Sequence, residues 1–322
     1  MVLGILIMTK NDKKNIAVII PLNDINEFQG GSKSGQKQSI SYFDMFLMLY
    51  ESIKGNWKKE KFYFKIILLH SLPFSYSNQE ILEKLDITQI KVEPADHPLK
   101  LRPIAYTIDI DCDYRLILDA DMIALQEPCF DFNKDIQAMY GGNKFNRNQW
   151  DKICCYFGIK TPNYLCLRLK PGRYGAWRVN ENFIFNALNI FGIEIKLFPY
   201  FNNGAILVKN EISNHLGTEF IKYRRLYTEY IYKTESIDID LEGQDVIGLA
   251  IDNITKNWSS FDSGINFIIQ EKYFLTKLLV KIFPYKRVCL FHYINLQENN
   301  LYLDKLNYYR DLIDRKYRNI SN

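Results

Sequence analysis

The sequence predicts an α/β protein with a mostly parallel central sheet and helices on both of its faces. Short continuous apolar runs alternate along the chain with segments whose apolar residues recur at helical spacing. A continuous apolar run is typical of a strand buried on both faces, and strands that alternate with helices are typical of parallel sheets. With 322 residues, 47% of them hydrophobic, the chain is long enough to build a large core.

The first third of the chain carries this pattern most clearly. Residues 15–22 read Asn-Ile-Ala-Val-Ile-Ile-Pro-Leu and predict the first buried strand, which ends near Pro21. Phe43, Phe46 and Leu47 lie at helical spacing and predict a helix over residues 41–53. The elements expected next are strands at 62–69, 89–92 and 115–118 and helices at 77–85 and 101–108, with Pro103 in the first turn of the last helix.

The rest of the chain continues the pattern after an interruption. Residues 143–180 are rich in Gly, Pro and Trp and are predicted to be irregular. A strand is expected at 204–208, and helices are expected at 215–232 and from 243 to 251. No Pro/Ser-rich linker or internal repeat divides the chain, which favours a single domain with insertions.

The composition argues against several classes of protein. A net charge of +4, from 41 basic and 37 acidic residues, is too small to indicate a nucleic-acid groove. The six cysteines form no C-x-x-C pair and no disulfide framework, which argues against a zinc site and favours a reduced, cytoplasmic protein. The apolar run at residues 2–8 is far shorter than the roughly 20 residues that span a bilayer.

Two acidic residues follow the strand predicted at 115–118. Asp119 and Asp121 lie where that strand ends, which is the edge at which open α/β sheets bind ligands. Side chains at positions i and i+2 of an extended chain point to the same side, so both carboxylates can hold one divalent cation. Apolar neighbours desolvate the two carboxylates, and a cation offsets that cost. Taken alone, however, such a pair is also an ordinary boundary between a strand and a loop.

Several motifs together resemble glycosyltransferase family 8, a GT-A-fold group that includes bacterial galactosyltransferases and glycogenins. The segment from Arg102 to Asp121 resembles the donor-site region of this family, in which an Arg precedes a D-x-D motif. The remaining likenesses follow in the family's order: Phe201-Asn-Asn-Gly204 to its Phe-Asn-Ala/Ser-Gly motif, Glu242-Gly-Gln-Asp245 to its Asp-Gln-Asp motif, Trp258 with residues 264–267 to its Leu-Pro-x-x-Tyr-Asn-Phe segment, and Phe291-His292-Tyr293 to its late His. The likeness covers most of residues 100 to 295.

The resemblance implies transfer of a sugar from a nucleotide-diphosphate donor, expected to be a UDP-sugar, to a glycan, glycolipid or protein. It implies that Asp119, Asp121 and His292 bind Mn²⁺ or Mg²⁺. It further implies that Asn203, Gln244 and Asp245 act beside the reacting sugar, with retention of the anomeric configuration. The donor would be bound by both acidic residues of the D-x-D motif and by Asn23, Asp24, Arg102, Ala120, Asn202 and Gly204.

These residue types suit that reaction. Negative charge builds on the departing β-phosphate, and a divalent cation that bridges both phosphates stabilises it. Carboxylate oxygens suit either metal, and an imidazole ligand favours Mn²⁺. The guanidinium of Arg102 can bind a diphosphate through two donors at once. In an inverting enzyme, Asp245 would instead be the general base.

The same resemblance divides the single domain, residues 1–322, into parts. Residues 15–140 are expected to bind the nucleotide sugar, 141–180 to be an irregular insertion, 181–295 to form the acceptor side and 296–322 to form a helical tail. One feature departs from the family, because Gly-x-Lys-Pro-Trp does not follow the late His. Lys286, Arg287 or Lys305 would have to replace the diphosphate-binding Lys of that motif.

Each assignment has an alternative. Arg102 could pair with a surface carboxylate, Asp245 could stabilise the first turn of a helix, and His292 could be a buried core histidine. Asn202 and Asn203 could be turn residues with left-handed backbone. Two alternatives remain for the whole protein. One is a nucleotidyltransferase, although residues 30–35 only loosely resemble the Gly-rich basic loop of such enzymes. The other is an inactive nucleotide- or carbohydrate-binding module.

A further segment raises the question of a membrane. Residues 273–287 mix apolar and basic side chains, as an interfacial helix does. This composition is compatible with a peripheral membrane contact, although a packed helix is the commoner explanation.

Overall fold

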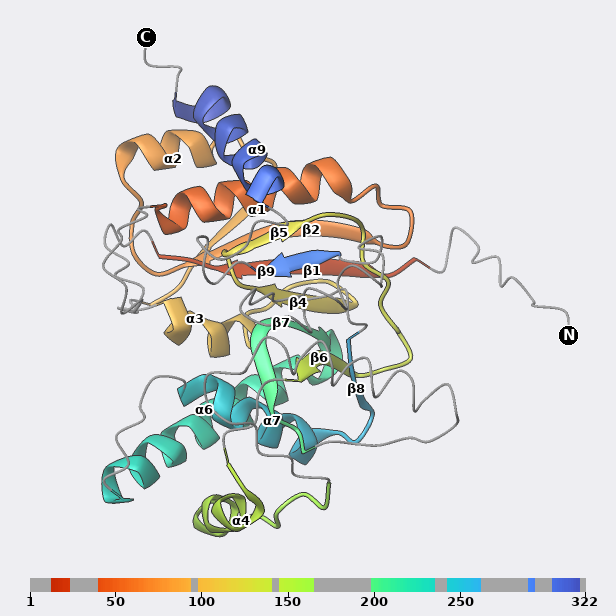
Figure 1. The fold of residues 1–322 in the computed structure, drawn as a ribbon, viewed down its shortest axis with the longest axis vertical. Helices are drawn as coiled ribbons and strands as arrows, with labels where there is room; N and C mark the ends of the chain where they lie inside the picture. Colours follow the sequence, from red (N-terminus) through yellow and green to blue (C-terminus); the bar gives the residue numbers. More distant parts are fainter. Residues whose placement is uncertain are drawn as a thin grey trace, which may run out of the picture.

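Seven strands form the central sheet. The computed structural model describes residues 13–23, 40–93, 98–140, 145–164, 198–234, 242–261, 289–292 and 303–318. The strands are β1 (Asn15–Pro21), β2 (Tyr63–His70), β3 (Thr88–Lys91), β4 (Tyr114–Leu118), β6 (Ile136–Tyr140), β7 (Phe201–Lys209) and β8 (Trp258–Ser260), and they lie in the order β3-β2-β1-β4-β7-β6-β8. Only β7 runs antiparallel to its neighbours, β4 and β6 (Figure 1). The predicted α/β fold with a mostly parallel sheet is therefore confirmed.

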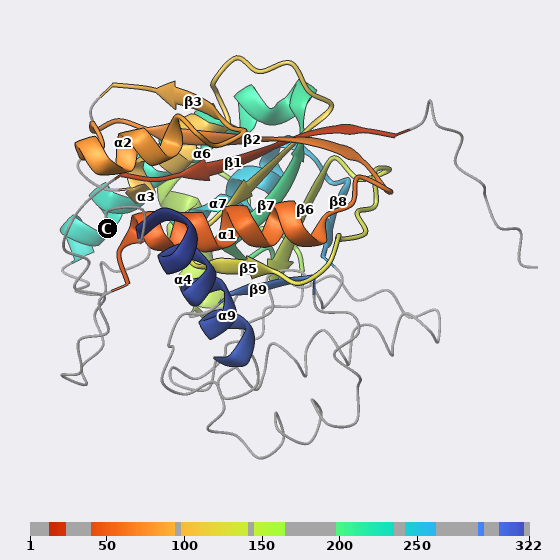
Figure 2. The ribbon, with the colours of Figure 1, turned by 90° about the horizontal axis from the view of Figure 1, so that it is seen from above.

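Helices cover both faces of this sheet. One face packs against α1 (Tyr42–Asn56), α9 (Leu303–Ile313) and a small second sheet made of β5 (Met122–Ala124) and β9 (Leu290–His292). The other face packs against α3 (Pro98–Ala105), α4 (Arg147–Tyr156), α6 (Asn210–Thr234) and α7 (Glu242–Ile254). The helix α2 (Tyr76–Leu82) lies between β2 and β3 in the chain, and a π-helical turn, η4 (Asp314–Arg318), continues α9. Figure 2 shows α9 crossing α1, with β5 and β9 next to α1.

Alternate residues of each strand enter the two cores. In β1, Val18 and Ile20 contribute to the core under α1, whereas Ala17 and Ile19 contribute to the core under α3 and α6. This alternation follows from the two-residue period of a strand. It explains why the sequences of β1 and β4 are largely apolar, because both faces of these two strands are buried.

Two local predictions differ from the structure, and one strand was not predicted. The helix that carries Arg102 begins at Pro98, so Pro103 lies inside α3 and not in its first turn. Residues 147–156 form helix α4 within the stretch predicted to be irregular, and Asn146 closes a capping box with Gln149 at its start. The run after Asp121 forms the three-residue strand β5, which is too short for its sequence to show a period.

The strand β5 is held by α1 as well as by β9. The backbone N–H of Ala124 donates a hydrogen bond to Ser52 Oγ at 2.9 Å, and Asn56 Nδ2 donates to the Ala124 carbonyl at 2.8 Å. Asn56 Nδ2 also lies 2.7 Å from the hydroxyl of Tyr309 on α9. Ser52 and Asn56 thus satisfy the backbone N–H and carbonyl of Ala124, which a strand edge would otherwise leave unpaired.

Two glycines allow close packing around α6 and α7. A Cβ atom on Gly248 of α7 would lie 1.5 Å from the carbonyl oxygen of Pro199, just before β7. A Cβ atom on Gly217 of α6 would lie 2.4 Å from Thr107 Cγ2. Both helices therefore approach their neighbours more closely than any other residue type allows. No helix in the described ranges is long and apolar enough to cross a membrane.

The close approach at Gly248 leads to a stability prediction. Gly248→Ala should destabilise the protein by about 2 kcal/mol or more, because the backbone of Pro199 must move. Gly55→Ala, in the last turn of α1, is the matched control, since its Cβ would meet only Tyr309 Oη at 3.9 Å. There the helix propensity of Ala should stabilise the protein by about 0.5 kcal/mol. Urea unfolding measures both changes, and equal effects would contradict the packing argument.

Candidate active site

The site is built where β4 ends and β7 begins. Leu118 pairs with Ala205 across these antiparallel strands, and the N–H of Asp119 donates a hydrogen bond to the Gly204 carbonyl at 2.8 Å. Antiparallel pairing places the start of β7 beside the end of β4. The two motifs, more than 80 positions apart in sequence, therefore meet at one edge of the sheet.

An irregularity in β7 shapes its contribution. Along β6, Ala138 pairs with Ile206 and the next residue, Met139, pairs with Asn202, so the pairing skips residues 203–205. Such bulges re-aim side chains and are frequent next to active sites. Within β7, Asn202 Oδ1 accepts a hydrogen bond from the Gly204 N–H at 2.8 Å. Neither Asn202 nor Asn203 has left-handed backbone, so the turn alternative does not apply.

Asn203 presents an acceptor that lacks a partner. The side chain is half-buried, and its Oδ1 atom is inaccessible to solvent yet accepts no hydrogen bond. A buried acceptor without a donor costs free energy, which a hydroxyl group of a ligand could recover.

Arg102 and Asp119 form the main ion pair of the site. Nη2 of Arg102 contacts Oδ1 of Asp119; the side chain of Arg102 is almost fully buried, whereas that of Asp119 is 27% exposed. Arg102 therefore does not pair with a carboxylate on the open surface, as one alternative proposed. Its Nε and Nη1 are buried and make no hydrogen bond. Burial lowers the pKa of Arg102, and the charges of Tyr106 and Asp121 act in the opposite direction.

The far end of α3 is fixed by a second arginine. Arg115, at the start of β4, donates from Nη1 to the carbonyls of Ala105 and Tyr106 at 3.1 and 2.9 Å, and from Nε to Asn210 Oδ1 at 2.7 Å. Ser213 Oγ donates to the same Tyr106 carbonyl at 2.8 Å. These bonds satisfy the last carbonyls of α3 and so fix the helix that positions Arg102.

Asp121 lies one residue before β5 and is partly exposed. Ala120, between the two acidic residues, is buried. The first residue of α1, Tyr42, is close enough for electrostatic coupling to Asp121: burial raises the pKa of Tyr42, and the negative charge of Asp121 raises it further. The hydroxyl of Tyr42 therefore stays protonated at neutral pH and can donate a hydrogen bond. The helical pattern of residues 41–53 gave no sign of this contact, because Tyr42 fits the apolar side of the helix like the core residues that follow it.

The backbone of His292 lies next to the D-x-D segment. His292 of β9 pairs with Met122 of β5, the residue that follows Asp121. Paired residues in an antiparallel ladder have Cα atoms about 5 Å apart. The chain therefore brings His292 to the edge where a metal ligand is expected, and its role as a ligand stays a prediction.

Asn23 is bound by its own protein. It is fully buried, and its Oδ1 accepts hydrogen bonds from Ser71 N at 2.9 Å, Ser71 Oγ at 3.1 Å and Leu72 N at 3.3 Å. It therefore fixes the turn after β2 beside the end of β1. Gln244 and Asp245 lie in the first turn of α7, which fits the helical alternative for Asp245 without deciding its role. The side chains of Gln244, Asp245 and His292 lie outside the described residues, as do Asp24, Lys286, Arg287 and residues 273–287.

The described donors fit a hard divalent cation in part. Two carboxylates and one guanidinium leave an excess of negative charge at this edge, and carboxylate oxygens suit Mg²⁺ or Mn²⁺. Among the side chains that the structure describes, no group of three or more His, Cys, Asp and Glu could hold a metal. Two carboxylates with a diphosphate are nevertheless the usual way in which Mg²⁺ is held.

This arrangement of strands and helices is found in solved glycosyltransferases. The galactosyltransferase LgtC, in complex with donor and acceptor sugar analogues, superposes with a TM-score of 0.50 and 13% identity over 92% of this chain and 95% of that one. The chain has the GT-A fold. The glycosyltransferase GlyE of Streptococcus pneumoniae TIGR4 superposes with a TM-score of 0.45 and 15% identity over 95% of this chain and 63% of GlyE. No protein-family model and no curated protein matches the sequence. The likeness to LgtC confirms the expected GT-A fold.

The burial of Arg102 predicts an asymmetry in stability. Asp119→Asn should destabilise the protein by about 3 kcal/mol, because the guanidinium then lacks its contacting counter-charge. Arg102→Met should cost only about 1 kcal/mol, since Asp119 is accessible enough to be hydrated. Asp121→Asn is the matched control and should cost less than 1 kcal/mol. Guanidinium unfolding compares the three, and a smaller loss for Asp119→Asn than for Arg102→Met would contradict the prediction.

Proposed function

We propose that the protein is a metal-dependent glycosyltransferase that transfers a sugar from a UDP-sugar to an acceptor. The observation that carries the proposal is the meeting of Asp119, Asp121, Arg102 and Asn203 at the one sheet edge of a GT-A fold. Further support comes from LgtC, which was solved with donor and acceptor sugar analogues. We also propose a cytoplasmic location, on the cysteine pattern.

Each described residue has a task in this reaction. Asp119 and Asp121 would hold Mn²⁺ or Mg²⁺, which supplies Lewis-acid stabilisation of the departing diphosphate when bound. Arg102 has two buried, unpaired N–H groups, and these can bind a phosphate oxygen or a donor-sugar hydroxyl. Asn203 Oδ1 can accept a hydrogen bond from a sugar hydroxyl. Tyr42 stays protonated beside Asp121 and can donate a hydrogen bond to an anionic oxygen.

The remaining residues complete the proposal. Gln244 and Asp245 would lie beside the reacting sugar, His292 would be a third metal ligand, and Asn202 with Gly204 would shape the sugar pocket. Asn23 would support the donor site indirectly, by fixing the turn after β2. Asp24 would bind the nucleotide, and Ala120 would pack against the donor. Retention is proposed from the resemblance to family 8, and NMR of the product anomer tests it.

The metal role is tested at Asp121. Asp121→Asn should lower Mn²⁺-dependent hydrolysis of a UDP-sugar by about 100-fold or more, because a ligand of the cation that stabilises the leaving group is lost. Titration calorimetry should show that the variant also loses the Mn²⁺ dependence of UDP binding. Asp131→Asn, in the loop before β6, is a control that should leave both unchanged. Wild-type rates in Asp121→Asn would remove the metal from the mechanism.

Asn203 separates catalysis from folding. Asn203→Ala removes a buried acceptor that has no partner, so stability should be equal or slightly higher. Loss of a hydrogen bond to the donor sugar should nevertheless lower kcat/KM about tenfold or more, with UDP binding unchanged. Thermal unfolding, kinetics and calorimetry measure these three quantities. Unchanged kinetics would show that Asn203 does not contact the sugar.

A further inference from the structure

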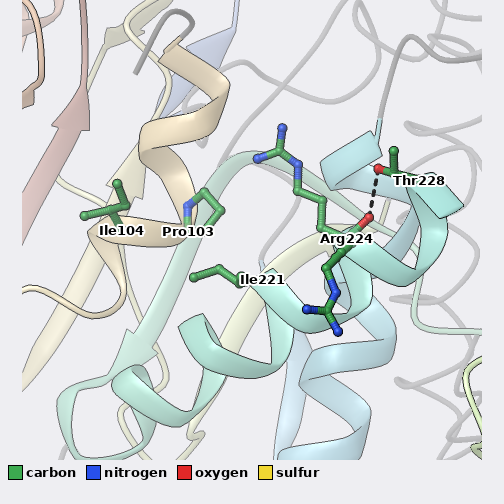
Figure 3. A pocket seen from close by; sticks show the side chains of 6 residues that line it. Pro103, Ile104, Ile221, Arg224 and Thr228 are labelled. Atoms are coloured by element: carbon green, nitrogen blue, oxygen red, sulfur yellow. Dashed lines mark hydrogen bonds between the residues drawn. The ribbon is translucent and has the colours of Figure 1, made fainter. Parts of the chain in front are cut away.

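A groove separates α3 from the middle of α6 on the outer side of the molecule. It encloses about 330 Å³ and is lined by Pro103, Ile104, Ile221, Arg224, Arg225 and Thr228. Figure 3 shows Pro103 and Ile104 of α3 opposite Ile221 and Arg224 of α6. This volume is at the lower end of the range of small-molecule sites.

The groove results from how the two helices cross. At Gly217 the absence of a side chain lets α6 approach the Pro103 carbonyl, Tyr106 and Thr107. One turn further along α6, Ile221 occupies the position that faces α3, and the groove lies between this larger side chain and α3. The groove is therefore fixed by backbone packing and by the bonds that Ser213 and Arg115 make to Tyr106.

The groove borders α3, the helix that carries Arg102. Its α3 residues, Pro103 and Ile104, directly follow Arg102, which contacts Asp119. α6 starts at Asn210, beside Arg115 at the other end of β4. α6 also packs against α3, so the groove follows the helix that carries Arg102.

The lining of the groove is apolar with a cationic rim. Pro103, Ile104 and Ile221 supply apolar surface, and Ile221 is 49% exposed, which is unusual for Ile. Arg224 and Arg225 add two guanidinium groups. The side chain of Arg225 is 77% exposed and lies 3.7 Å from Glu229, an i,i+4 surface pair of the weak kind that an anionic ligand can replace.

We propose that this groove binds an acidic sugar residue of the acceptor, through its carboxylate or phosphate and its apolar C–H face. The inference rests on the proposed function, because it takes the sheet edge at Asp119, which α3 contacts through Arg102, as the site of transfer. Arg224 and Arg225 bind the anionic group, since a guanidinium fork matches the oxygens of a carboxylate or a phosphate. Pro103, Ile104 and Ile221 contact the C–H face. The groove then selects acceptors without contacting the donor.

The experiment uses two probes that differ in one group, 4-nitrophenyl β-D-glucuronide and 4-nitrophenyl β-D-glucoside. Their binding to the full chain is measured by ligand-observed NMR at low ionic strength, without donor. The glucuronide should bind about tenfold more tightly than the glucoside, because its carboxylate forms charge-assisted hydrogen bonds. Raising the salt concentration should reduce this preference, since the groove is open to solvent.

Variants locate the preference. Arg224→Gln combined with Arg225→Gln should abolish the preference for the glucuronide, and circular dichroism with thermal unfolding should show an unchanged fold. Lys222→Gln combined with Lys233→Gln is the matched control, because these α6 cations bind Glu219 and Tyr156 away from the groove. This control removes the same charge and should keep the preference. Equal binding of both probes to the wild type, or a preference that survives the arginine changes, would overturn the proposal.

Failure of the groove can be distinguished from failure of the proposed function. UDP binding with Mn²⁺ in the absence of any glucuronide preference would leave the transferase proposal standing and remove the groove. A preference that depends on Arg224 and Arg225, without any binding of UDP, would leave an acidic-sugar site and remove the transferase. In an active preparation, the double arginine variant should raise KM for an acidic acceptor and leave donor hydrolysis unchanged.

Discussion

The site depends on a buried guanidinium that faces a carboxylate at the end of β4. Removing a guanidinium from water costs several kcal/mol, and only a nearby negative charge offsets that cost. Arg102 meets this requirement by contact with Asp119. At the opposite end of the same strand, Arg115 donates to the last carbonyls of α3. Two arginines therefore connect α3 to β4 at both ends. Arg102 reaches from the helix to the end of the strand, and Arg115 reaches from the strand to the end of the helix. Arg102, the candidate diphosphate contact, and Asp119, the candidate metal ligand, therefore fix each other's position.

The direction of β7 determines what else reaches this edge. A parallel strand in that position would place its carboxyl end beside Asp119, whereas the antiparallel β7 places its first residues there. The pairing with β6 skips residues 203–205, which frees this stretch from a regular ladder while Gly204 stays bonded to Asp119. On the other face, Ser52 and Asn56 of α1 fix β5, the strand that begins after Asp121 and pairs with the strand of His292. Three separate supports thus converge on a segment of three residues, Asp119 to Asp121.

Much of the fold was predictable because its strands are buried on both faces. The continuous apolar runs at residues 15–22 and 115–118 identify β1 and β4, and Asp119 and Asp121 follow from where β4 ends. Three features were not predictable, for physical reasons. The strand β5 has three residues, too few to show a period, and its stability comes from α1 and β9, which are distant in sequence. The direction of β7 is set by tertiary pairing and leaves no local signal. The proximity of Tyr42 to Asp121 depends on how α1 packs against the segment of β5, which no local sequence pattern shows. The place of Arg102 came from the family resemblance, whereas its burial became known only from the structure.

The distribution of unsatisfied polar groups gives independent support for a ligand at this edge. Folded proteins pair nearly all buried polar atoms, since each unpaired group costs roughly 1–3 kcal/mol. Of the six buried side-chain nitrogen and oxygen atoms without a partner in the described part of the chain, three belong to Arg102 and Asn203. A purely structural ion pair would be expected to complete its hydrogen bonds, as Arg115 does with two carbonyls and Asn210. Arg102 instead leaves two buried nitrogens unpaired, and Asn203, from the strand that pairs with β4, leaves one buried acceptor unpaired. A ligand that brings both an anionic oxygen and a hydroxyl group would satisfy them together, and a sugar attached to a diphosphate carries both. The free energy spent in keeping these atoms unpaired would then be recovered on binding, which favours a preformed site over one assembled by the ligand.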